Sequence, residues 1–276
     1  FRGGVPLKAM LENIFKVPVF INNDGDLYAY GEALAGCLPK VNMELQKAGN
    51  AKQYRNLVGI TIGSGFGGGF VHDKSLITGD NVTACEIWKM SNRLDADNNS
   101  EEFITIRAVR RSYSESCNIP FEQTPTPFDI YQIAKGIQKG NMEAAQKAFA
   151  SLGRYLGDVL ANLVTIFDGV IAIGGGVSGA KEFIIPAVEE ELKHNFKTVS
   201  RTTQEVYCLN KEASLAKFLK PESKQIKVPF TNQTVEYSCT PKCAYVFSPF
   251  NTSQMISMGA YHFAKAFLFT SYEETE

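Results

Sequence analysis

Two short segments carry residue types that could bind a substrate or transfer a proton. Asn23 and Asp24 place an amide next to a carboxylate, directly before Gly25. A carboxylate beside a bound hydroxyl group can accept its proton and so act as a general base. Asn, Asp and Gly are also the usual residues of a simple turn, and this tripeptide taken alone favours a turn. The second segment is rich in glycine.

Five glycines lie within the seven residues from Gly63 to Gly69. The segment satisfies the G-x-G-x-x-G pattern of dinucleotide-binding loops. That loop must open a helix, however, and here extended structure resumes at Phe70. No G-x4-G-K-[ST] sequence occurs in the chain. The pattern therefore predicts a hairpin. One tight turn needs fewer glycines, so we favour a hairpin whose bare backbone N–H groups approach phosphate oxygens.

Three apolar runs, rich in β-branched residues, come just before the Asn-Asp pair and the glycine-rich segments. They predict strands over residues 17–21, 57–62 and 170–173. The third run leads into Gly174, Gly175 and Gly176, a turn that serves close packing, ligand binding or both. Strand ends hold side chains beside a crevice, where α/β proteins place their chemistry. Helices are expected over residues 7–14, 27–38, most of 100–166, 180–192, and from Thr252 onward with Thr252 as the N-cap.

Composition is that of an ordinary globular protein. Of the 276 residues, 44% are hydrophobic and 21% are charged, and the net charge of -1 does not favour nucleic-acid binding. No apolar run reaches the ~18 residues of a membrane span. Six scattered cysteines fit reduced thiols in a cytoplasmic protein. Cys239 and Cys243 form a C-x3-C pair without a second pair nearby, which favours unbonded thiols over a zinc site.

In their order and spacing, these motifs resemble the ROK family, a group of bacterial sugar kinases and related repressors with an actin-like ATPase fold. The likeness rests on Asn23-Asp24, the glycine hairpin, Glu86 and the triple glycine, and it resumes at residues 257–260. It implies an α/β, ribonuclease H-like fold with two lobes, of which the N-terminal one is incomplete. Residues 1–56 would be a remnant of the N-terminal sugar-binding lobe, and residues 57–276 the C-terminal lobe, with a β-rich insertion at about 200–250.

The resemblance also implies a function, namely ATP-dependent phosphorylation of a hexose or related sugar, with ATP and Mg²⁺ as cofactors. Asp24 would be the general base for the attacking sugar hydroxyl, while Asn23 and Glu86 would bind other hydroxyls. Adenosine would lie against Gly174, Gly175 and Gly176. The residues expected to contact the ATP phosphates are Gly63, Ser64, Gly65, Gly67 and Gly68. No residue of this sequence is assigned as a metal ligand.

The sequence departs from the family's E-x-G-H motif after Glu86, where Trp88 and Lys89 replace the glycine and the histidine. That histidine serves both sugar and zinc in the family. Residues 93–111, where the zinc motif should follow, contain neither cysteine nor histidine, so structural zinc is not expected. Trp88 is the only tryptophan. It could stack on a sugar or fill volume, and we favour packing.

The family's opening strand and glycine turn, with the aspartate that helps to position Mg²⁺, have no counterpart in this sequence. We therefore expect a fragment that is nearly inactive alone, because metal and phosphate positioning supply most of the rate. The resemblance implies a homodimer. Two alternatives stay open: a sugar-sensing repressor domain, whose DNA-binding helix-turn-helix would lie outside this sequence, and an inactive sugar-binding relative. Retention of Asp24 and both glycine clusters argues against the inactive relative.

Overall fold

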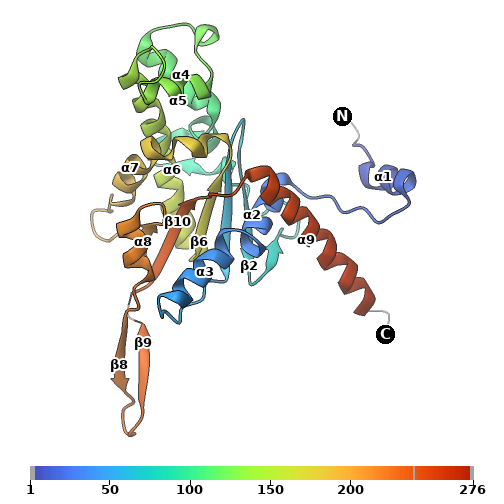
Figure 1. Ribbon diagram of the computed structural model, residues 1–276, viewed down its shortest axis with the longest axis vertical. Helices are drawn as coiled ribbons and strands as arrows, with labels where there is room; N and C mark the ends of the chain where they lie inside the picture. Colours follow the sequence, from blue (N-terminus) through green and yellow to red (C-terminus); the bar gives the residue numbers. More distant parts are fainter. Residues whose placement is uncertain (1–3, 239, 274–276) are drawn as a thin grey trace.

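A six-stranded mixed sheet forms the centre of the molecule, with helices on both faces (Figure 1). The computed structural model describes residues 4–238 and 240–273. In order across the sheet, the strands are β3 (Ser75–Ile77), β2 (Phe66–His72), β1 (Asn56–Ile62), β6 (Val170–Gly174), β10 (Lys242–Phe247) and β7 (Glu205–Cys208). The last four run parallel to one another, and β2 and β3 extend the sheet in antiparallel fashion.

The helices divide between the two faces of the sheet. They are α1 (Leu7–Phe15), α2 (Asp24–Leu34), α3 (Cys37–Lys47), α4 (Ile106–Cys117), α5 (Pro127–Ala134), α6 (Met142–Phe167), α7 (Lys181–Leu192), α8 (Glu212–Leu219) and α9 (Thr252–Glu273). Helices α6 and α7 cover one face, and α4 and α5 pack against α6. Helices α2, α3 and α8 cover the other face, where α9 crosses α2.

Short elements complete the chain. They are the two-stranded pairs β4 (Ser91–Asn92) with β5 (Asp95–Asn99) and β8 (Ser223–Lys227) with β9 (Thr234–Ser238), and the 3-10 turns η1 (Ile87–Lys89), η2 (Ser100–Glu102), η3 (Phe121–Gln123) and η4 (Gly176–Ala180).

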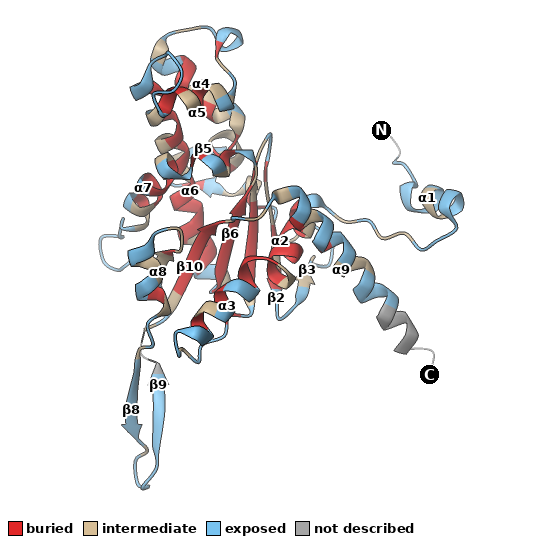
Figure 2. Cartoon of the chain, viewed as in Figure 1, coloured by how far each residue is buried: buried red, intermediate tan, exposed pale blue. Residues whose placement is uncertain are grey.

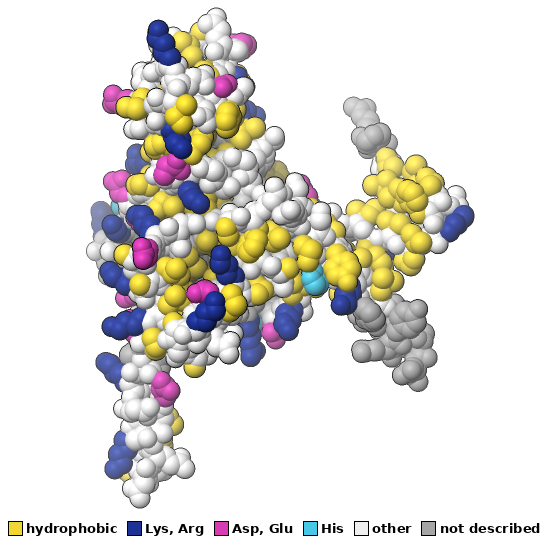
Figure 3. All heavy atoms as spheres, in the orientation of Figure 1, with side chains coloured by type: hydrophobic (Ala, Val, Ile, Leu, Met, Phe, Trp, Pro, Cys, Tyr) yellow, Lys and Arg dark blue, Asp and Glu magenta, His cyan; other side chains and the backbone are white. Residues whose placement is uncertain are grey.

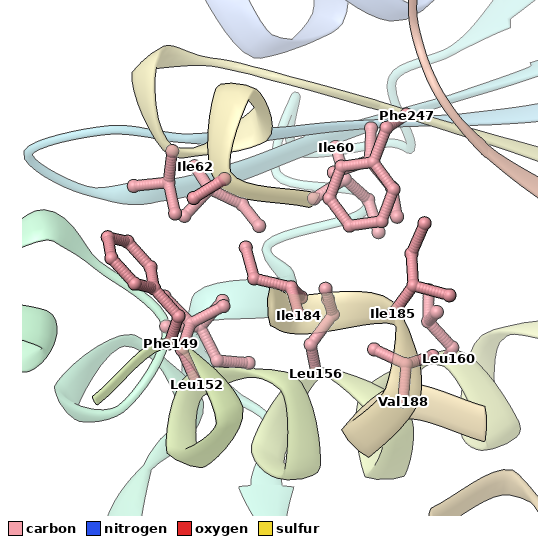
Figure 4. Packing of buried hydrophobic residues seen from close by; sticks show 14 of the residues in the cluster. Ile60, Ile62, Phe149, Leu152, Leu156, Leu160, Ile184, Ile185, Val188 and Phe247 are labelled. Atoms are coloured by element: carbon pink, nitrogen blue, oxygen red, sulfur yellow. The ribbon is translucent and has the colours of Figure 1, made fainter. Parts of the chain in front are cut away.

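The main core lies between the sheet and helices α6 and α7. Side chains alternate along a strand, so Val58, Ile60 and Ile62 of β1 all face this core. Figure 4 shows Ile60 and Ile62 pointing toward Leu156 of α6 and Ile184 of α7. The buried residues concentrate in the sheet and the inner faces of its helices (Figure 2). This packing fixes the ends of β1 and β6, where the glycine-rich segments begin.

Helix α2 owes its position to close contact with α9. A Cβ atom added at Gly259 would lie 1.8 Å from the backbone oxygen of Leu27, and one added at Gly31 would lie 2.0 Å from that of Met255. Both distances are far inside van der Waals contact, so the two helix backbones can meet only where both residues are glycine. The crossing fixes α2 against the sheet.

Two local expectations were wrong at the start of the chain. Residues 17–21 form no strand, and within the described ranges no strand lies beside them to supply ladder hydrogen bonds. The helix expected over 27–38 is two helices, α2 and α3. The break occurs where the Glu32 carboxylate accepts the Cys37 N–H at 2.8 Å, and a side chain at Gly36 would collide with Glu32.

The N-cap of helix α9 was expected at Thr252, but the structure places it one residue earlier. Asn251 Oδ1 accepts the Gln254 N–H at 3.1 Å, so Asn251 is the N-cap, while the Thr252 hydroxyl accepts the Gly175 N–H at 2.9 Å. The strands expected at 57–62 and 170–173 and the helices expected over 7–14 and 180–192 are present to within a few residues, whereas β7, β10 and α8 were not expected. Cys239, one half of the C-x3-C pair, lies outside the described residues.

Helices in the described ranges include none that is long and apolar enough to cross a membrane.

Residues 200–250 contribute to two separate structures. Strands β7 and β10 belong to the central sheet, whereas β8 and β9 pair only with each other and project from the body (Figure 1). Helix α1 also stands apart, none of its residues is buried, and apolar side chains gather on it and on nearby α9 (Figure 3). The division into lobes at residue 56 stays a prediction.

Candidate active site

Both glycine turns leave the sheet from the same edge. β1 and β6 are parallel neighbours with Thr61 opposite Gly174, so their carboxyl ends lie side by side. Gly175 has φ +95°, and a Cβ there would lie 2.3 Å from the Ile62 backbone oxygen. Only glycine allows this close passage between the two strand ends. The Gly175 N–H donates a hydrogen bond to the Thr252 hydroxyl, a contact that sequence analysis missed.

The turn after β1 is tied to the segment before α4. Gly63 N–H donates to the Gly65 oxygen, and Ile106 N–H donates to the Gly63 oxygen, both at 3.0 Å. Phe66 N–H donates to the Glu101 carboxylate at 3.0 Å. Glu101 also lies 3.0 Å from the position of a Cβ on Gly65, which places a negative charge beside that glycine. Sequence analysis missed Glu101, because it comes from a segment 35 residues away.

The open part of this turn is Gly63 and Ser64. Ser64 is exposed, and no atom lies within 4 Å of a Cβ built on Gly63. Gly67 and Gly68 instead lie inside β2. A Cβ on Gly68 would come within 2.7 Å of Ile87, so packing accounts for this glycine. Phosphate contact by the hairpin residues stays a prediction.

Asn23 and Asp24 begin helix α2. The Asn23 side-chain oxygen accepts the Gly25 N–H at 2.8 Å as the helix N-cap, and Asp24 is the first helical residue. A Cβ built on Gly25 would lie 3.3 Å from the Gly68 nitrogen, so the start of α2 rests on the glycine-rich strand. Both Asn23 and Asp24 are exposed. The carboxylate thus stands in solvent beside β2, at a helix N-terminus that favours negative charge.

Glu86 belongs to a small cluster on the other side of Gly68. Its carboxylate is exposed and accepts a hydrogen bond from the indole N–H of Trp88. The Trp88 ring packs against the main core, and the Lys89 ammonium lies 4.9 Å from the ring centre. Trp88 therefore packs and also orients Glu86. The residues described contain no cluster of three or more His, Cys, Asp or Glu side chains arranged for a metal ion.

Asp26 is a second acid in the first turn of α2 that sequence analysis missed. Its side chain is buried against Gly69. Burial raises the pKa of Asp26 to about 6, and the charge of Glu86 contributes to this rise. The signal in the sequence was weak, because Asp two residues after Asp24 looks like an ordinary charge in the first turn of a helix.

Replacing Asp26 by asparagine is expected to flatten the pH dependence of folding stability. Because the folded state binds this proton more tightly than the unfolded chain does, the stabilisation is complete near pH 4 and is lost as pH rises through about 6. The substituted amide stays neutral, so the variant should gain up to about 3 kcal/mol over wild type between pH 4 and 8. Urea titrations at both pH values measure this, and Glu86→Gln should produce a smaller change. If the free energies of unfolding of wild type and Asp26→Asn change with pH in parallel, the prediction is wrong.

Comparison with known proteins places this arrangement in a family. A sequence model of the ROK family matches residues 3–216. The glucokinase of Streptomyces coelicolor is 25% identical over 206 residues, which are 68% of this chain and 61% of that protein. The chain therefore spans about three-fifths of the length of this curated relative.

Solved structures share the fold. A glucokinase from Parabacteroides distasonis is 44% identical, with a TM-score of 0.89 over 96% of this chain and 74% of its own. A ROK family glucokinase from Streptomyces griseus, solved with glucose and AMPPNP, has a TM-score of 0.54 at 19% identity over 92% of this chain and 70% of its own, a likeness of fold alone. The fold is that of the actin-like ATPases, as expected. Since the family match extends over well more than half of the sequence, this chain belongs to the ROK family.

Proposed function

We propose that this protein is an ATP-dependent sugar kinase that phosphorylates a hexose or related sugar, with Asp24 as the general base. One observation carries the proposal: the exposed Asp24 carboxylate starts a helix that rests on Gly68 of the glycine-rich strand β2, which pairs with the end of β1. Membership of the ROK family and the likeness to glucokinases support it.

The nucleotide side of the site would use exposed backbone. Gly63, Gly176 and Gly179 each have open space where a Cβ would stand, so their backbone is accessible to a ligand. ATP would supply the phosphoryl group, its phosphates contacting Gly63 and Ser64 and its adenosine lying against Gly174 to Gly176. Mg²⁺ is expected with ATP, and we assign no residue of this chain to it.

The sugar side would use Asn23, Asp24 and Glu86. Asp24 would accept the proton of the attacking hydroxyl, a contribution of about 10²–10⁴-fold to the rate. The Asn23 oxygen is engaged as the helix cap, which leaves its NH₂ group to donate to a sugar oxygen. Glu86, oriented by Trp88, would accept hydrogen bonds from other hydroxyls. Positioning supplies most of the catalysis in phosphoryl transfer.

The direct test is release of ADP from Mg-ATP in the presence of single hexoses, measured on this chain and on a longer version that also carries the family's opening strand and glycine turn. Sugar-dependent ADP release supports the proposal. The proposal is wrong if no hexose gives ADP release and no hexose raises the melting temperature of the protein. The repressor alternative predicts a thermal shift with sugar and no ADP release from either version. Sugar kinases and repressors of the family share this fold, so the fold itself favours neither function.

Gly63→Ala is expected to weaken ATP binding without loss of stability. The added methyl group meets no protein atom, so folding should be unaffected. If a phosphate lies against the Gly63 backbone, the methyl group occupies that space and displaces it, and the Kd for ATP should rise about 10-fold or more. Calorimetric titration of ATP together with a melting curve measures both. An unchanged Kd would remove Gly63 from the nucleotide site.

A further inference from the structure

The segment from Glu86 to Glu101 touches both sides of the proposed site. Glu86 at its start is the acid proposed to bind sugar, and Glu101 at its end accepts the Phe66 N–H of the glycine-rich strand β2 at 3.0 Å. Between the two acids the chain forms the β4–β5 hairpin. Ser100 closes the base of this hairpin, because its N–H and its hydroxyl both donate to the Met90 oxygen at 2.9 Å. The position of the hairpin therefore constrains the positions of both acids.

Little apolar burial fixes this hairpin in place. Of residues 91–99, Asn92 alone is buried, and strand β5 is largely exposed. The Asn92 side-chain amide donates to the Tyr155 backbone oxygen of α6 at 3.0 Å. The Arg93 N–H donates to the Asp158 carboxylate of the same helix, also at 3.0 Å. Polar contacts made by the turn of the hairpin thus fasten it to α6.

The Arg93 side chain extends this contact into a buried group of charges. Its guanidinium lies 3.7 Å from the Asp158 carboxylate and also pairs with the Glu191 carboxylate of α7. Arg201, which follows α7 in the chain, pairs with the same two carboxylates, and its distance to Glu191 is 2.7 Å. Arg201 also donates to the Asp158 backbone oxygen at 3.1 Å. Two arginines from different segments thus meet two acids from neighbouring helices.

Charge balance requires both arginines of this group. The side chains of Asp158, Glu191 and Arg201 are at most 6% exposed, whereas that of Arg93 is 35% exposed. A buried charge is costly unless charged partners and hydrogen bonds satisfy it. The two acids carry two negative charges, and Arg201 supplies one positive charge. Because Arg93 supplies the other, the hairpin that carries it is held against α6 and α7.

We propose that Arg93, Asp158, Glu191 and Arg201 form a charged clamp that holds residues 86–101 where Glu86 can bind sugar. These four are positioning residues, since they act on the ligand through the hairpin. The sugar-binding consequence rests on the proposed function, whereas the fastening of the hairpin does not. If the ion pairs served only the packing of α7 on α6, the hairpin would keep its place without Arg93.

Arg93→Met tests the clamp, because it removes the side-chain contact of the hairpin and leaves Arg201 paired with both acids. Water reaches the site of the lost charge, so the protein should still fold. Measured on the whole chain, the backbone amides of residues 86–101 should exchange hydrogen about 5-fold faster or more. Amides inside α6 should keep their wild-type exchange rates.

Two further variants control for the substitution itself. Arg93→Lys retains a positive charge within reach of Glu191 and should restore slow exchange in large part. Arg154→Met removes a neighbouring exposed arginine of α6, which lines the same surface hollow as Arg93. It should leave the exchange of residues 86–101 unchanged.

Calorimetric titration with glucose, and then with other hexoses, measures the consequence for the ligand. For a hexose that wild type binds, Arg93→Met should raise the Kd about 10-fold. Wild type that binds no hexose would count against the proposed function, and hydrogen exchange alone would then decide whether the clamp exists. Unchanged exchange of residues 86–101 in Arg93→Met would overturn the proposal, even if the melting temperature falls. Faster exchange with an unchanged Kd for a bound hexose would overturn it as well.

Discussion

Asp24→Asn, introduced into a longer version that also carries the family's opening strand and glycine turn, should lower the kcat for phosphorylation of a hexose about 10²–10⁴-fold, because asparagine has the shape of aspartate but cannot accept the hydroxyl proton. The KM for sugar should change by only a few-fold if the amide keeps the neighbouring hydrogen bonds. Folding should be nearly unaffected. The side chain is exposed, Asn23 still caps the helix, and the lost charge–dipole interaction is worth at most about 1 kcal/mol.

The control is Asp97→Asn, which neutralises another exposed acid, on β5. It should retain full activity in the same coupled assay of ADP release. If Asp24→Asn also keeps its kcat within a factor of two, Asp24 is not the base, and the carboxylate at the start of α2 has a structural role only.

Gly259→Ala should cost about 3 kcal/mol or more of folding stability, at the upper end of what overpacking a core usually costs. Its methyl group would stand 1.8 Å from the Leu27 backbone oxygen, so α9 and α2 must separate. Because two backbones meet there, no side-chain rotation can relieve the clash. Movement of α2 would also displace Asp24 from β2, so activity should fall with stability. Urea unfolding measures the stability loss.

Gly179→Ala is the matched substitution for that experiment. It adds the same methyl group, but no atom lies within 4 Å of the new position. Its unfolding midpoint should equal that of wild type. A Gly259→Ala protein with an equally unchanged midpoint would show that α2 and α9 cross less closely than the 1.8 Å approach at Gly259 implies.

Features set by neighbouring residues were predictable from the sequence. The runs at 57–62 and 170–173 became β1 and β6, because β-branched apolar runs and the following glycines are local signals. The long helix α6 follows from its apolar repeat. The order of these motifs was enough to predict family and fold, both of which the comparisons confirm.

Features set by distant partners were not predictable. Residues 17–21 have the composition of a strand, but strand formation needs a neighbour that only the fold could supply. Glu101 reaches Phe66, and Thr252 reaches Gly175, from segments far along the chain. The sequence could not show that a side chain at Gly68 would collide with Ile87, and phosphate contact by Gly68 stays a prediction.

A crystal structure of the protein with glucose and AMPPNP would test the central claim most directly. We expect a glucose hydroxyl within hydrogen-bonding distance of the Asp24 carboxylate, and phosphates against the backbone of Gly63 and Ser64. Glucose bound with no hydroxyl near Asp24, or a nucleotide bound away from the paired ends of β1 and β6, would contradict it.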